Sequence, residues 1–136
     1  QVDVFQENGY TKEEMKMHFE GQNILHTPAL KASVTCVRVP VYRSHAVAVT
    51  AVFENEPNVD AAREAIEAAP GVQLVDDPFA EDPKFPTPLD CTDGDACLVG
   101  RIRKDLVLDK ALTFWVVGDQ VRKGAALNAV QIAELL

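Results

Sequence analysis

The stretch "ASVTCVRVPVYRSHAVAVTAVF", residues 32–53, decides the fold of this 136-residue chain. Residues 32–41 and 45–53 are both dense in valine and alternate with smaller or polar residues, which is typical of β-strands. The intervening "YRS" is short enough for a tight turn, so the stretch predicts two strands joined as a hairpin. Pro40 has no N–H to donate to a ladder and should lie near the end or edge of its strand.

Two helix-start signals lie on either side of this stretch. Thr11, followed three residues later by a glutamate, forms a capping-box pattern and predicts a helix over 11–25. Asn58 precedes a run with helical apolar spacing that ends at "PG", which predicts a second helix over 58–69.

The rest of the chain predicts three further strands, a loop and a final helix. The loop, residues 76–95, is rich in proline and aspartate, which excludes regular structure there. The predicted strands cover 72–75, 97–104 and 112–118, and the final helix covers 120–136. The order αββαββα, with one further short strand over 72–75, predicts an α+β fold, in which a mostly antiparallel or mixed sheet carries helices on one face.

Composition excludes several classes of protein. The net charge of −8 disfavours nucleic-acid binding, and no apolar run approaches the roughly 20 residues of a membrane span. The three cysteines (Cys36, Cys91 and Cys97) lack CxxC spacing, so we expect buried thiols, no metal site and a cytoplasmic location. No glycine-rich phosphate-binding motif occurs, so most of any nucleotide site must lie elsewhere.

Arg38 and His45 are the first candidate functional pair. In the predicted hairpin they are diagonal neighbours on one largely apolar face, roughly 7–8 Å apart. Arg38 could hold a carboxylate through its planar fork, and His45 could transfer a proton near neutral pH. The structural alternative, an arginine in a salt bridge and a histidine that caps a turn, is favoured by the pattern alone.

Glu13 and Lys16 are a second pair, three residues apart on the first predicted helix and therefore on one face. They could bind opposite ends of a zwitterionic or phosphate-bearing ligand. A solvated surface ion pair is the more common meaning of such spacing.

Four stretches resemble, in order, the C-terminal half of the aspartate-semialdehyde dehydrogenase family, and the resemblance runs from residue 1 to 136. They are "DVFQENGYTKEEMKM" (3–17), "CVRVPVYRSHAVAV" (36–49), "VGRIRK" (99–104) and "WVVGDQVRKGAALNAVQIAE" (115–134).

The resemblance implies NADPH-dependent reductive dephosphorylation of L-aspartyl 4-phosphate to the semialdehyde, on the route to lysine, threonine and methionine. It implies that residues 1–136 are the C-terminal substrate-binding and dimerisation domain of a two-domain homodimeric or larger enzyme, with the other side of the sheet used for dimerisation. The N-terminal NADP-binding domain and the nucleophilic cysteine are expected outside this chain, so the chain alone should be inactive. The helix over 120–136 would pack on that domain in the full enzyme.

The family's site residues carry over one by one. The resemblance makes Arg38 the anchor of the substrate carboxylate and His45 the acid and base. Glu13 would face the substrate amino group and Lys16 the phosphate, while Gln120 of "GDQ" would reach the nicotinamide end of NADP.

Two alternatives stay open. The chain could be a stand-alone dimerisation or interaction module. It could also belong to a related acyl-phosphate reductase, such as N-acetylglutamyl-phosphate reductase or glyceraldehyde-3-phosphate dehydrogenase.

Overall fold

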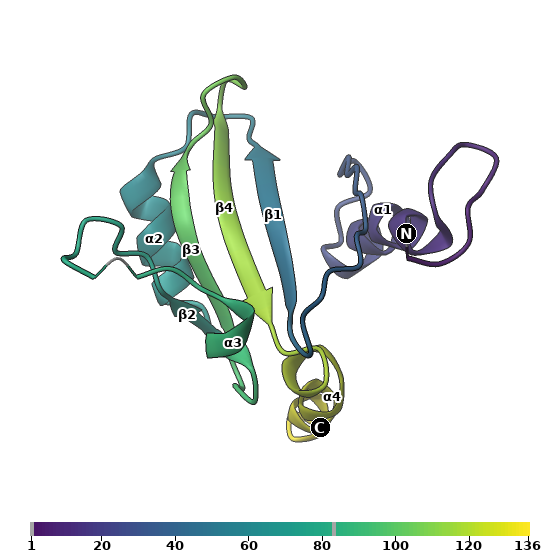
Figure 1. Ribbon diagram of the computed structural model, residues 1–136. Coiled ribbons are helices and arrows are strands. Elements are labelled where there is room, and N and C mark those ends of the chain that lie inside the picture. Colours follow the sequence, from purple (N-terminus) through teal and green to yellow (C-terminus); the bar gives the residue numbers. More distant parts are fainter. Residues whose placement is uncertain (1, 83) are drawn as a thin grey trace. The chain divides into compact units, whose positions relative to one another are not determined.

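The computed structural model describes residues 2–82 and 84–136, which fall in two compact units, Gln1–Pro40 and Val41–Leu136. The first unit holds helix α1 (Lys12–Ile24), and the second holds a four-stranded mixed sheet with its own helices (Figure 1). The predicted α+β class is confirmed. Within the described ranges, no helix is both long and apolar enough to cross a bilayer.

Helix α1 starts where its capping signal predicts. The Thr11 side chain accepts the Glu14 N–H at 3.3 Å, and the Glu14 carboxylate accepts the Thr11 N–H at 2.8 Å. These two bonds satisfy backbone donors that the first turn of a helix otherwise leaves unpaired. Both backbone bonds to Glu14, from Thr11 and from Cys36, lower the pKa of its carboxyl, which therefore stays charged at neutral pH.

The prediction of a strand over residues 32–41 is wrong. This segment has no regular structure, and strand β1 (His45–Val52) pairs instead with strand β4 (Ala111–Gly118), antiparallel. The diagonal Arg38–His45 pairing inferred from a hairpin is therefore wrong as well. Alternating valines specify an extended backbone but not its ladder partner, and Pro40 cannot donate to a ladder.

The four strands lie in the order β1-β4-β3-β2. The pairs β1–β4 and β4–β3 (Cys97–Lys104) are antiparallel, whereas the short β2 (Val72–Leu74) runs parallel to β3. The predicted strands over 72–75, 97–104 and 112–118 are confirmed in type and place.

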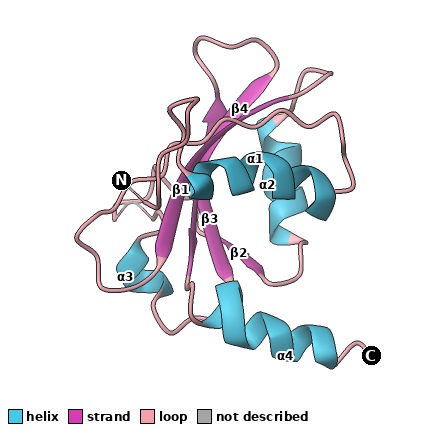
Figure 2. Cartoon of the chain, turned by 90° about the vertical axis from the view of Figure 1, so that its right-hand side faces the viewer, coloured by secondary structure: helices cyan, strands magenta, loops and turns pink. Residues whose placement is uncertain are grey.

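Two helices lie against opposite faces of this sheet (Figures 1 and 2). Helix α2 (Val59–Glu67) begins at its predicted cap, because Asn58 accepts the Ala61 N–H at 2.9 Å, and it packs on β2 and β3. The one-turn helix α3 (Pro88–Cys91) lies within the stretch predicted as loop and corrects that prediction. Its signal was Thr87 as N-cap followed by proline at the first helical position. Cys91 joins Leu98 and Val117 in a small buried core on the same face.

A bulge interrupts β3 between Gly100 and Arg103, with Arg101 at a φ of +59°. The Asp76 carboxylate accepts the freed N–H groups of Arg101 and Ile102 at 2.7 and 3.2 Å. Gly100 is required here, because an added Cβ would lie 2.1 Å from the Val75 carbonyl oxygen. The bulge is thus fixed by a backbone approach on one side and a buried carboxylate on the other.

The C-terminal helix begins with a π-helical turn, η1 (Arg122–Ala126), and continues as α4 (Leu127–Ala133). Figure 2 shows α4 beyond one end of the sheet, leading to the C-terminus. Apolar side chains along this helix and just before it are exposed: Val121, Ile132 and Leu135 have 51%, 56% and 87% of their surface accessible. That the predicted helix over 120–136 packs on another domain stays a prediction.

Candidate active site

The first unit carries the predicted pair Glu13 and Lys16 on neighbouring turns of α1. The Lys16 Nζ lies 3.0 Å from the Glu13 Oε2, and both side chains are exposed. The hydrogen bond that the Lys16 ammonium donates to the Glu13 carboxylate raises the pKa of Lys16, so the ammonium stays charged. The pair presents one anion and one cation to solvent, and the geometry agrees with both the ligand-binding and the surface-pair interpretation.

A polar stripe on α1 holds the segment that leads to Arg38. Glu14 accepts the Cys36 N–H at 2.8 Å, the His18 Nδ1 lies 2.7 Å from the Ala32 carbonyl oxygen, and Gln22 donates to the Leu30 carbonyl oxygen at 2.8 Å. The three side chains are spaced four residues apart and so share one helical face. We did not predict this stripe; its sequence signal was polar residues at i, i+4 and i+8.

The stripe fixes the direction of the chain before Arg38. Because later residues bond to earlier turns of α1, the segment runs antiparallel to the helix, toward the turn that carries Glu13. Arg38 follows two residues after the last tether. Its side chain is exposed and has no partner among the described residues of its unit. A charged fork with free donors can bind a carboxylate.

In the second unit the structure brings His45 and Gln120 together. His45 is the first residue of β1 and pairs with Gly118, two residues before Gln120. The Gln120 Oε1 accepts the N–H of Ser44 at 2.7 Å. Ser44 is buried, has a φ of +75° and contacts the Thr92 hydroxyl at 3.3 Å. The residue that precedes His45 is therefore held by Gln120 itself.

Sequence reasoning missed the buried carboxylate beside this pair. Asp119 is fully buried, and its Oδ1 accepts the N–H groups of Val121 and Arg122 at 2.9 and 3.1 Å. Its Oδ2 accepts the Asp93 N–H at 2.8 Å and lies 2.9 Å from the Arg43 Nε. That Nε–H is not aligned for a hydrogen bond, so the contact with Arg43 is an ion pair. The available signal was aspartate directly before a helix, a common capping position.

Asp119 is charged despite its burial. Burial alone raises the pKa of a carboxyl, but the backbone N–H groups of Asp93, Arg122 and Val121, together with Arg43, lower it to about 2. The site therefore contains a fixed negative charge that is neutralised by Arg43 and by backbone dipoles.

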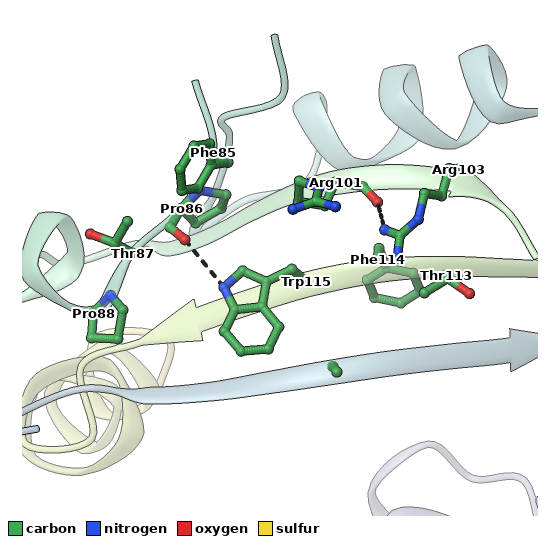
Figure 3. A pocket seen from close by; sticks show the side chains of 10 residues that line it. Phe85, Pro86, Thr87, Pro88, Arg101, Arg103, Thr113, Phe114 and Trp115 are labelled. Atoms are coloured by element: carbon green, nitrogen blue, oxygen red, sulfur yellow. Dashed lines mark hydrogen bonds between the residues drawn. The ribbon is translucent and has the colours of Figure 1, made fainter. Parts of the chain in front are cut away.

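A hollow lies elsewhere, on the sheet face that carries α3 (Figure 3). It has a volume of about 390 Å³ and contains none of the predicted site residues. The Trp115 Nε1 donates to the Pro86 carbonyl oxygen at 3.2 Å along its wall. Its other prominent lining residues are Phe85, Arg101, Arg103 and Phe114.

The described residues offer no metal centre, because no group of three or more His, Cys, Asp or Glu side chains within 2–82 and 84–136 could hold an ion. The three cysteines are free thiols. Burial raises the pKa of Cys36 and of Cys91, which makes both poor nucleophiles.

Gln120 fits the nicotinamide end of a dinucleotide in its donor chemistry. Its Oε1 is occupied by the Ser44 N–H, which leaves the two Nε2 protons without a partner among the described residues. Such an amide can donate to the carbonyl oxygen of a carboxamide.

Known proteins resemble this chain closely. The protein-family model described as "Semialdehyde dehydrogenase, dimerisation domain" matches residues 1–123. Aspartate-semialdehyde dehydrogenase of Aquifex aeolicus is 48% identical over 135 residues, which are 99% of this chain and 39% of the relative. The Campylobacter jejuni protein of the same name is 52% identical over 134 residues, or 98% and 38% of the two chains.

Solved structures agree with these relatives. The aspartate semialdehyde dehydrogenase II of Vibrio cholerae complexed with ASA matches with a TM-score of 0.92 and 45% identity, over 100% of this chain and 39% of that chain. The Candida albicans enzyme with NADP matches with a TM-score of 0.76 and 25% identity, over 93% and 42% of the two chains. The chain thus spans about two fifths of the length of these relatives, and it belongs to the semialdehyde dehydrogenase dimerisation-domain family.

Proposed function

We propose that this chain is the substrate-binding and dimerisation part of an NADP-dependent aspartate-semialdehyde dehydrogenase, inactive without the rest of the polypeptide. The observation that carries the proposal is the hydrogen bond from the Ser44 N–H to Gln120, which ties the predicted acid–base residue to the predicted cofactor contact. Relatives of that name, 48% and 52% identical, support the same reaction.

The first unit supplies the anchors for L-aspartyl 4-phosphate. The guanidinium of Arg38 binds the α-carboxylate through its fork, because paired N–H groups match the two oxygens of a carboxylate. Glu13 binds the ammonium group and Lys16 the phosphate, so that each charge of the substrate meets its opposite. The exposed, unpaired state of Arg38 within its unit supports this role.

The second unit supplies proton transfer. A neutral ring nitrogen of His45 accepts the proton of the thiol that attacks the acyl phosphate, and phosphate leaves as the C–S bond forms. The protonated ring returns the proton to the thiolate that is freed when the product aldehyde is released. The attacking cysteine belongs to the part of the enzyme outside this chain. NADPH, when bound, supplies the hydride, and Gln120 orients its carboxamide through the free Nε2 protons.

The proposal is tested with the polypeptide encoded by the complete source gene. Purified enzyme should reduce NADP when given aspartate semialdehyde and phosphate, whereas the 136-residue chain alone should not. A higher kcat/KM with N-acetylglutamate semialdehyde or glyceraldehyde 3-phosphate would transfer the chain to a related reductase. A gene that starts at residue 1 and encodes only this chain would favour the interaction module.

Arg38→Leu in that enzyme should chiefly raise the KM for aspartate semialdehyde, with a loss of about 2–4 kcal/mol in kcat/KM, because a charge-assisted pair is broken in a desolvated site. Arg38→Lys keeps the positive charge but lacks the paired N–H donors of the guanidinium. Its KM for aspartate semialdehyde should lie between those of the wild type and Arg38→Leu. Steady-state kinetics measure the effect, with Lys31→Leu, an exposed cation of the same unit, as the control. An unchanged KM in Arg38→Leu would make this arginine structural.

We also propose that the domain pairs with a second copy of itself and works in the cytoplasm. The family description, a dimerisation domain, supports the first part, and the three free thiols fit a reducing compartment. Sedimentation equilibrium should give twice the chain mass of 14.9 kDa for the isolated chain. A monomer at all accessible concentrations would mean that pairing needs other parts of the enzyme.

A further inference from the structure

Asp119 joins three segments that are distant in sequence. Its carboxylate accepts N–H groups from the turn after α3 (Asp93) and from the start of η1 (Val121 and Arg122). It also forms an ion pair with Arg43, in the turn before β1, at 2.9 Å. Both carboxylate oxygens are therefore fully used inside the protein, at a side chain with no accessible surface.

Arg43 extends this junction. Its Nη1 lies 2.7 Å from the Asp93 Oδ1 while its Nε faces Asp119, so one guanidinium bridges two carboxylates. Such a bridge fixes the backbone of residue 43 more tightly than one contact would, because the fork is planar and rigid.

The residue between Arg43 and His45 needs this support. Ser44 adopts a φ of +75°, a left-handed conformation that is strained for a residue other than glycine. It persists only where its surroundings over-determine it. Here the constraints are the ion pair of Arg43 with Asp119, the Gln120 acceptor at 2.7 Å and the half-buried contact with the Thr92 hydroxyl.

We propose that Asp119, acting through Arg43, is a positioning residue that sets the placement of His45 relative to Gln120. Two residues of the proposed function lie next to this buried junction in the sequence: Gln120 follows Asp119, and His45 follows Ser44. Asp119 itself touches no substrate. The inference rests on the proposed function for its catalytic consequence, and on the contacts above for its structural part.

Asp119→Asn is the sharpest variant. Its Oδ1 can still cap η1, but an amide NH₂ in place of the Oδ2 sets donors against the Asp93 N–H and the Arg43 Nε. In the 136-residue chain, hydrogen exchange of the Ser44 amide should become about tenfold faster or more relative to exchange of the β1–β4 ladder amides. The reason is that a local opening around Ser44 exposes its amide to solvent but leaves the ladder amides protected. In the full-length enzyme kcat should fall about 10- to 100-fold with the KM for aspartate semialdehyde nearly unchanged.

Asp95→Asn is the matched control. This exposed carboxylate pairs with Arg122 in the same neighbourhood but touches neither Arg43 nor Ser44. It should leave both the Ser44 exchange rate and kcat within about twofold of wild type. If Asp119→Asn does not fold, Arg43→Gln, which spares the cap of η1, should give the same two effects.

The outcomes separate the inference from the proposed function. Two results in Asp119→Asn would overturn the positioning role of Asp119. One is exchange of the Ser44 amide that changes only as much as exchange of the ladder amides, and the other is a loss of kcat no larger than that of Asp95→Asn. If His45→Asn itself leaves turnover intact, the proposed role of His45 fails, and the structural part of the inference is then decided by the exchange data alone.

Discussion

His45→Asn in the full-length enzyme is expected to lower kcat by about 10²–10⁴-fold, because it removes the group that moves the proton in the proposed reaction. Asparagine approximates the size of the imidazole and keeps hydrogen-bonding capacity, but it cannot hold a proton near neutral pH. The side chain is exposed at the first position of β1, so the exchange should leave the β1–β4 ladder intact.

Steady-state kinetics with aspartate semialdehyde, phosphate and NADP measure this effect, with KM expected to change little. His26→Asn is the matched control: His26 is exposed and has a φ of +51°, which asparagine tolerates well. Turnover of His45→Asn at the level of this control would remove His45 from the mechanism.

Asp76→Ala is expected to lower the free energy of unfolding of the second unit by about 3–5 kcal/mol, since it breaks a buried pair and strands the partner charge. The Asp76 side chain is 1% exposed, lies 2.9 Å from both the Nε and the Nη2 of Arg63, and accepts two N–H groups of the β3 bulge. Its loss leaves both backbone donors of the bulge without their acceptor and leaves the guanidinium with only the longer contact to Asp60.

Urea unfolding monitored by Trp115 fluorescence suits this measurement, because the single tryptophan of the chain lies in β4. Asp60→Ala provides the comparison: Asp60 also faces Arg63, at 3.7 Å, but its side chain is 85% exposed. That variant should lose no more than about 1 kcal/mol. Equal losses in the two variants would show that the bulge does not depend on Asp76.

The elements that the sequence predicts correctly are those with local signals. Thr11 and Asn58 cap helices through side chains that reach backbone groups three residues away, so a short window contains the whole interaction. The alternating valines of β1 likewise indicate an extended backbone wherever its partner lies.

The failures involve partners that are far apart in sequence. Residues 32–41 have the same alternation as β1, and the hairpin prediction paired these two neighbouring segments with each other. The residues of β1 instead pair with residues of β4 that lie 59 to 73 positions later in the chain. Asp119 was missed for the same reason, because Arg43 and Asp93 become its neighbours only in the folded chain. The sequence pattern alone made Arg38, His45, Glu13 and Lys16 candidates, and the resemblance to a family gave them roles. Neither composition nor periodicity would have singled out Gln120.

The pairing of β1 with β4 also determines when the sheet can form during synthesis of the chain. His45 can pair with Gly118, and Ser44 can bond to Gln120, only after residues 118–120 have been synthesised. The surroundings of His45 are therefore completed late in synthesis of these 136 residues. Until then the valine-rich β1 has none of its native ladder bonds and is exposed to wrong pairing, the hazard of long-range β-topology during synthesis. Nascent chains that stop before residue 111 therefore carry β1 without its ladder partner β4.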